Sequence, residues 1–251
     1  MSGHSKWATI KHKKAATDAK RGRAFTKVIR EITIAARTGG GDPDSNPRLR
    51  TAILAAKNEN MPNENIERAL ARGTGTLDGE QYEEVNFEGY GPGGVGMIIQ
   101  VVTTNRNRIV SELRHIMNKH GGNMAETGAV GWMFHRKGDI FVSKEQANED
   151  KMLSIVLDAG AEDLRDDGSS WEVLTPPEGF EAVREALTKA GITPESAEVD
   201  WVPQNYVKLT GSPAAQMLRL IEALEEHDDV QRVSANFDID EKEIQAVMAA
   251  E

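Results

Sequence analysis

The chain has 251 residues and a formal charge of −10 at pH 7, with 30 Lys and Arg against 40 Asp and Glu. It has no cysteine, which excludes disulfides, a thiol nucleophile and a thiolate metal site and fits a reducing compartment. No run of about 18 apolar residues occurs, so no membrane-spanning helix is expected. The basic N-terminus lacks the apolar segment of a secretory signal, and we expect a cytoplasmic protein.

The first 37 residues reverse the charge of the chain. They hold ten Lys or Arg and two acidic residues, Asp18 and Glu31. A basic arm on an acidic body is typical of proteins that bind a polyanion. The residues predicted to contact nucleic acid are Lys6, Trp7, Lys11, Lys13, Lys14, Lys20, Arg21, Arg23, Lys27 and Arg30. Trp7 either stacks on a base or packs against the first helix.

The pattern from residue 17 onward predicts an amphipathic helix. Phe25, Val28, Ile29, Ile32 and Ala36 recur at three- and four-residue spacing and form one apolar face. The cations Lys20, Arg23, Lys27 and Arg30 recur at the same spacing on the opposite side. We call these four residues the cationic stripe and expect it to contact phosphates, the alternative being a solvated helix face. Changing all four to Gln should then leave the fold intact.

Two shorter helices are expected next. Glycines 39–41 and Pro43 end the first helix, and Asn46 followed by Pro47 is typical of a helix N-cap. A second helix should run to about residue 59, and a third should start after Pro62 and end at Gly73. The single arginines on these helices could extend the cationic surface, but as exposed charges they are expected to be solvated; they are Arg48, Arg50, Arg68 and Arg72. Residues 1–80 are therefore predicted to form a basic helical domain with an N-terminal arm.

Mixed α/β structure is expected after residue 81. Strands are predicted at 82–90, 95–104 and 129–135, with a helix at 108–120. Residues 138–204 follow a strand–helix–strand–strand–helix–strand order, which is ferredoxin-like. A strand, a helix and another strand follow in 206–237.

These patterns predict an α+β protein, in which an all-helical N-terminal domain precedes two mixed α/β domains, one ferredoxin-like and inserted in the other. The expected boundaries are 81–137 with 205–238 for the discontinuous domain, 138–204 for the insertion and 239–251 for an acidic tail. The acidic domains could face protein partners.

No catalytic, metal-binding or cofactor-binding constellation is apparent. The glycines of 91–96 fit the spacing of a dinucleotide fingerprint, but they precede a strand rather than a helix and so predict a tight hairpin loop. The acidic pairs Asp166-Asp167 and Asp228-Asp229 are expected in solvated turns. Trp132 and Phe134 alternate along the strand expected at 129–135 and should lie in a core or a domain interface.

Arg106 and Arg108 form a candidate anion site. They stand where a strand should end and a helix begin, where the helix dipole is already positive. Their placement is favourable if a phosphate binds there. The alternative is that Glu112 or a carboxylate from another domain pairs with them.

Several ordered motifs resemble those of the YebC/PmpR family. They include Gly3-His4-Ser5-Lys6-Trp7, residues 20–27, Asn46-Pro47-Arg48-Leu49-Arg50, residues 88–94 and Asn105-Arg106-Asn107-Arg108. The likeness extends over nearly the whole chain. It implies three domains with a cavity between them and a cytoplasmic, DNA-binding, transcription-regulating protein.

Two hypotheses about function follow. In the first, the protein is a DNA-binding regulator without an obvious base-reading helix. In the second, it is a translation factor that binds ribosomal RNA, because bacterial members of the family have been linked to ribosomes stalled on proline runs and mitochondrial relatives act as translational activators. Neither hypothesis requires an enzyme activity or a cofactor.

Overall fold

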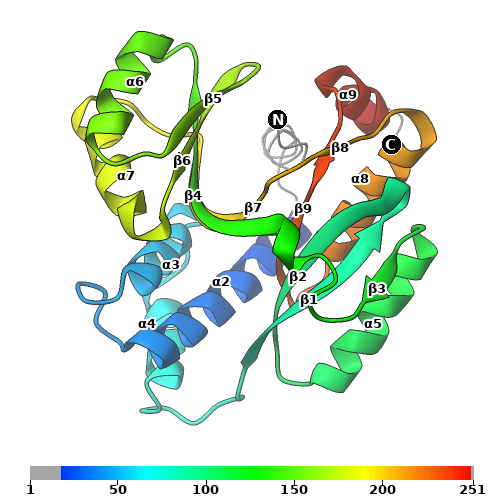
Figure 1. Cartoon of the computed structure of the whole chain (residues 1–251). Helices are drawn as coiled ribbons and strands as arrows, with labels where there is room; N and C mark the ends of the chain where they lie inside the picture. The colour runs from blue at the N-terminus through cyan, green and yellow to red at the C-terminus, as the bar shows by residue number, and fades with distance from the viewer. Residues whose placement is uncertain (1–17, 250–251) are drawn as a thin grey trace.

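The computed structural model describes residues 18–249, and the side chains from residue 22 to residue 247. Within the described residues, three helices come first and pack on one another (Figure 1). They are α2 (Asp18–Gly39), α3 (Pro47–Asn58) and α4 (Asn63–Gly73). Asn46 caps α3 as predicted, because its side chain accepts a hydrogen bond from the Leu49 N–H at 3.1 Å. A β-carbon on Gly73 would meet the carbonyl oxygen of Thr33 at 2.5 Å, so glycine lets α4 lie directly against α2.

The second domain is an antiparallel sheet with helices on one face. The strand order is β3-β1-β2-β9, and α5 and α8 share a buried core with β2 and β9. Its elements are β1 (Glu83–Gly91), η1 (Pro92–Gly94), β2 (Val95–Thr103), α5 (Arg106–Lys119), β3 (Asn123–Ala125), α8 (Gly211–Glu225) and β9 (Val230–Ala235). The short parallel pair β8 (Val207–Lys208) and β10 (Phe237–Asp238) and the helix α9 (Glu241–Ala249) follow on the same side.

The third domain interrupts the second between β3 and β8. Its sheet has the order β5-β6-β4-β7, all antiparallel, with α6 and α7 on one face. The elements are β4 (Phe134–Ser143), α6 (Glu149–Asp158), β5 (Asp163–Asp167), β6 (Ser170–Thr175), η3 (Pro177–Gly179), α7 (Phe180–Lys189) and β7 (Ser196–Pro203). This is the ferredoxin-like arrangement, and the predicted fold class is confirmed. The exact domain boundaries remain a prediction.

The strand predicted at 129–135 is wrong. Residues 131–133 form the short helix η2 (Gly131–Met133), and β4 starts at Phe134 and continues through Gly138 without a break. Upstream, the Glu88 carboxylate accepts hydrogen bonds from the N–H groups of Gly128, Val130 and Gly131 at 2.6–2.8 Å. These bonds hold the backbone in a turn around one carboxylate, which an extended strand could not provide.

Trp132 and Phe134 were both expected in a core or a domain interface. Phe134 does lie in a domain interface, whereas Trp132 is exposed. Phe134 packs with Ile98 and Val130 in a small cluster between the two sheets, which Trp201 also contacts. Trp132 is 67% exposed, and its indole N–H donates to the Ala129 carbonyl. Because η2 replaces the extended strand, Trp132 turns outward while Phe134 stays buried.

Candidate nucleic-acid interface

Helix α2 buries its apolar face as predicted. Phe25, Val28, Ile29, Ile32 and Ala36 pack into the core that α2 forms with α3 and α4. The opposite side of α2 meets the second domain at the turn between α8 and β9. The described part of the cationic stripe therefore faces another domain.

Three members of the cationic stripe contact this turn. The Arg23 guanidinium lies 3.2 Å from a carboxylate oxygen of Glu226. Lys27 Nζ donates to the Glu225 carbonyl. Arg30 donates to the Asp228 carbonyl and lies 2.7 Å from Asp229 Oδ1, with its guanidinium also 5.5 Å from the centre of the Tyr82 ring. Backbone carbonyls at the C-terminus of a helix are a favourable site for cations.

Asp229 is the centre of this contact, and the prediction that it lies in a solvated turn is wrong. Its side chain is 2% exposed and pairs with both Arg30 and Arg108. Thr103 Oγ1 donates to the same carboxylate at 2.7 Å. Burial alone would raise the pKa of Asp229, but the Thr103 hydrogen bond and the charges of Arg30 and Arg108 outweigh it and lower this pKa.

The four residues Arg30, Arg108, Thr103 and Asp229 come from three elements and one turn, and we call them the Asp229 cluster. Arg30 also contacts the Val102 carbonyl at the end of β2. The cluster thus joins the helical domain to the second domain. The expectation that the cationic stripe could be changed to Gln without affecting the fold is therefore revised.

The candidate anion site divides into two residues with different surroundings. Arg108 pairs with Glu112 at 3.2 Å and with Asp229. This is the second of the two expected arrangements, in which carboxylates rather than a phosphate neutralise the arginine. The Asn105 side chain accepts from the Arg108 N–H at 3.0 Å and caps α5. Arg106 is exposed, and no ion pair to it is found among residues 18–249. Only Arg106 still suits the phosphate contact.

The other predicted contact residues lie mostly outside the described part. Lys6, Trp7, Lys11, Lys13 and Lys14 precede residue 18. Lys20 and Arg21 lie in the first turn of α2, where the structure describes the backbone alone. Residues 1–21 together hold six Lys or Arg and one acidic residue, whereas the whole chain is at −10.

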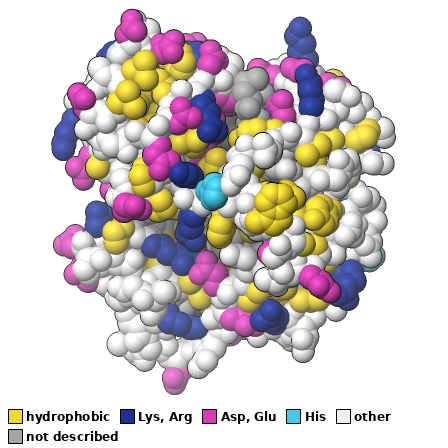
Figure 2. All heavy atoms as spheres, viewed as in Figure 1, with side chains coloured by type: hydrophobic (Ala, Val, Ile, Leu, Met, Phe, Trp, Pro, Cys, Tyr) yellow, Lys and Arg dark blue, Asp and Glu magenta, His cyan; other side chains and the backbone are white. Residues whose placement is uncertain are grey.

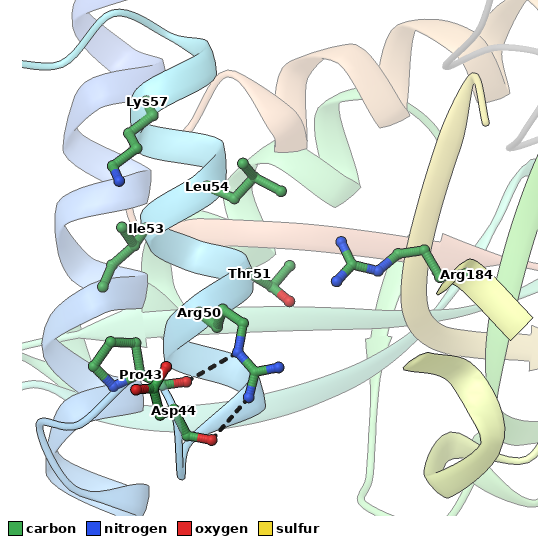
Figure 3. Close-up of a pocket in the computed structure, with 8 residues that line it drawn as sticks. All are labelled: Pro43, Asp44, Arg50, Thr51, Ile53, Leu54, Lys57 and Arg184. Atoms are coloured by element: carbon green, nitrogen blue, oxygen red, sulfur yellow. Dashed lines mark hydrogen bonds between the residues drawn. The ribbon is translucent and has the colours of Figure 1, made fainter. Parts of the chain in front are cut away.

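A cleft between α3 and α7 adds a cationic surface that the sequence did not indicate (Figure 3). Its volume is about 370 Å³. Arg50 and Lys57 from α3 and Arg184 from α7 line it, beside the apolar wall of Ile53 and Leu54. Arg184 reaches from α7 toward α3 in Figure 3. Periodicity along one helix could not have found this cleft, because it takes cations from two domains.

Two of these three cations contact neighbouring groups. Arg50 donates to the carbonyls of Pro43 and Asp44 at 3.0 Å each, and Arg184 pairs with Glu181 on its own helix at 2.5 Å. Arg50 bonds to carbonyls rather than to a carboxylate, and three cations line the cleft against one acidic residue, Asp44. The cleft can therefore offer positive charge to a phosphate while its geometry is held by the protein.

The surface of the described part is otherwise mixed in charge. Figure 2 shows Lys and Arg side chains interspersed with Asp and Glu over the face that it presents. Arg48, for example, pairs with Glu31 at 2.7 Å and with Glu84 at 2.9 Å. No group of His, Asp and Glu with the geometry of a metal site occurs within residues 18–249. No helix in that range has the length and apolar character needed to span a membrane.

A helical domain with a basic leading segment, followed by a sheet domain that contains a ferredoxin-like insertion, defines a class of three-domain α+β proteins. Family models cover both parts. Residues 5–76 match the TACO1/YebC protein N-terminal domain, and residues 82–237 match the TACO1/YebC second and third domain. The chain belongs to the TACO1/YebC family, as its motifs indicated.

Relatives align over almost their whole length. A probable transcriptional regulatory protein of Solibacter usitatus is 63% identical over 247 residues, covering 98% of this chain and 99% of that protein. One of Geotalea uraniireducens is 56% identical over 248 residues, covering 99% and 100%. The crystal structure of the conserved hypothetical protein Aq1575 from Aquifex aeolicus has a TM-score of 0.80 at 47% identity, covering 89% of this chain and 92% of that one.

Proposed function

We propose that this protein regulates gene expression in the cytoplasm by binding nucleic acid, duplex DNA in particular, through residues 1–21. The contacting side chains are Lys6, Trp7, Lys11, Lys13, Lys14, Lys20 and Arg21. The observation that carries the proposal is the segregation of charge: six cations and one acid precede residue 22 in a chain of net charge −10. The relatives named as probable transcriptional regulatory proteins support a regulatory role.

The Asp229 cluster supports a division of labour within the basic region. Arg30 is used to hold α2 against the second domain, and Arg23 and Lys27 reinforce that contact. Helix α2 therefore serves as a fixed base for the residues that precede it. Phosphate contact falls to those residues, which reduces the number of expected contacts to about six.

Additional contacts are proposed for three cations of the body and for Arg106. Arg50, Lys57 and Arg184 line the cleft between α3 and α7, and Arg106 is exposed at the start of α5. Each would add a phosphate contact if the nucleic acid extends beyond residues 1–21 over the folded domains. No base-reading set of Asn, Gln and Arg accompanies them, so weak sequence preference is expected.

Binding to three ligands at matched salt tests this proposal. We expect the intact protein to bind duplex DNA with a log–log salt slope near −5, since six phosphate contacts contribute about −0.9 each. A structured RNA hairpin and purified ribosomes serve as the competing ligands. If ribosomes co-sediment with the protein at salt that abolishes duplex binding, the DNA assignment fails and the ribosomal RNA hypothesis replaces it.

A further inference from the structure

The ferredoxin-like sheet carries acidic side chains on the face turned away from α6 and α7. Neighbouring residues of a strand point to opposite faces. In β6, Trp171 and Val173 pack into the core with α6 and α7, so Glu172 lies on the other face. In β4, Ile140 and Val142 belong to the same core and Asp139 faces the other way. Figure 1 shows that this second face is turned toward α8 and β9.

Strand register defines the rest of this surface. Arg165 lies across from Glu172, and Glu198 lies across from Asp139. We call the surface the acidic sheet face, and its acidic members are Asp139, Asp163, Asp167, Glu172, Glu198 and Asp200.

Glu172 is buried without adequate compensation. It is 1% exposed, and its Oε1 has no hydrogen-bond partner among the described residues. Among the described residues, the cation paired with it is Arg165, which is 4.0 Å from Oε2 and is itself bonded to Asp163 at 2.7 Å. A buried carboxylate that lacks hydrogen bonds is costly, which indicates that the face is built to receive donors.

Other polar groups on the acidic sheet face are also buried without a hydrogen-bond partner among the described residues. Asp139 Oδ1 and the Tyr206 hydroxyl are buried without a hydrogen-bond partner in the part of the chain that the structure describes. Burial, and after it the charges of Glu172 and Asp200, raise the pKa of Asp139. The described cations at this face are Arg165, Arg232 and Lys137, which lies across from Asp200 in the register; Lys137 pairs with Glu162, and Arg232 pairs with Glu198 and Asp200. Negative charge therefore exceeds positive charge at this surface.

We propose that the acidic sheet face binds residues 1–17 of the same chain. This segment is complementary in charge, since it has four lysines and no acidic residue. Its length is sufficient, because 17 extended residues reach about 55 Å, more than the diameter of a small domain. It also starts in the right place: α2 contacts β9, and Ser234 of β9 donates to Asp200 of the face at 2.8 Å.

This contact deepens the proposed function, on which its regulatory meaning rests. The carboxylates occupy the lysines that phosphates would otherwise contact. A nucleic acid must compete with the face for Lys6, Lys11, Lys13 and Lys14, and weak polyanion binding is thereby suppressed. The docking itself does not depend on which nucleic acid is bound.

Zero-length carbodiimide cross-linking of the intact protein tests the docking directly. We expect amide links from Lys6, Lys11, Lys13 or Lys14 to Asp163 and Glu198, which are the exposed carboxylates of the face. Glu149 and Asp150 are exposed on α6, behind the sheet, and provide the comparison. Links that form equally with these two residues, or that do not reach the face, would overturn the proposal.

The substitution Glu172→Gln tests the regulatory consequence. We expect it to tighten duplex DNA binding about 3- to 10-fold at low salt, while Glu178→Gln, an exposed control in the same domain, leaves the affinity unchanged. Unchanged affinity for Glu172→Gln, in a protein that melts normally, contradicts the competition. If no variant binds DNA, the proposed function fails, and the cross-links alone decide whether the arm docks.

Discussion

Replacing Asp229 with Ala should destabilise the protein by about 3–5 kcal/mol, because it leaves Arg30 and Arg108 without their shared carboxylate at a buried position. Thr103 would also lose an acceptor. The free energy of unfolding from urea denaturation measures the effect. The helical domain should separate first, since Arg30 joins it to the second domain through the buried Asp229.

The matched control is Glu226→Ala, which removes the exposed partner of Arg23 at the same turn. Exposed ion pairs contribute less than about 1 kcal/mol, so this variant should resemble the parent protein. A loss below 1 kcal/mol for Asp229→Ala as well would show that the cluster does not hold the domains together.

Low pH should remove the contribution that Asp229 makes to the free energy of unfolding. The pKa of Asp229 is lowered in the folded protein, so its contribution is complete above the ordinary carboxyl value of about 4 and declines as the pH falls through the lowered pKa. The difference in stability between the parent and Asp229→Ala should therefore shrink below about pH 4.

Changing Lys11, Lys13, Lys14 and Lys20 together to Gln should weaken duplex DNA binding by at least about 100-fold at 0.1 M salt. Four lost phosphate contacts should also make the log–log salt slope shallower by about 3.6. Fluorescence anisotropy over a range of salt concentrations gives both quantities. These residues are not part of the Asp229 cluster, so the contact between the helical domain and the second domain should persist and the variant should remain folded.

A variant with Arg68→Gln and Lys189→Gln is the control for net charge. Both residues are exposed and pair only with a glutamate on their own helix among the described residues. DNA affinity should change little. The two sets of changes are compared by the loss of DNA affinity per charge removed. If the losses are equal, the net charge of the whole protein, rather than phosphate contacts of the basic segment, accounts for the affinity.

Local sequence signals predicted most of the fold. The spacing of Phe25, Ile29 and Ile32 located the buried side of α2, and Asn46 marked the start of α3. The order of strands and helices after β3 indicated the inserted domain. These features depend on neighbours a few residues apart, which a sequence displays directly.

The errors arose where a distant residue decides the conformation. The strand expected at 129–135 is instead a short helix followed by β4, because the distant Glu88 carboxylate holds the N–H groups of Gly128, Val130 and Gly131. Asp229 was expected in a solvated turn, yet it meets Arg30 from 199 positions earlier. Periodicity identified the free side of α2 but could not show that another domain covers it.

The most direct measurement is ultraviolet cross-linking of the intact protein to bound duplex DNA, followed by mapping of the modified peptides. We expect adducts within residues 1–21, with Trp7 as the aromatic side chain that reacts. Adducts confined to residues 22–251 would contradict it, because the cations that precede the Asp229 cluster would then have no part in holding nucleic acid.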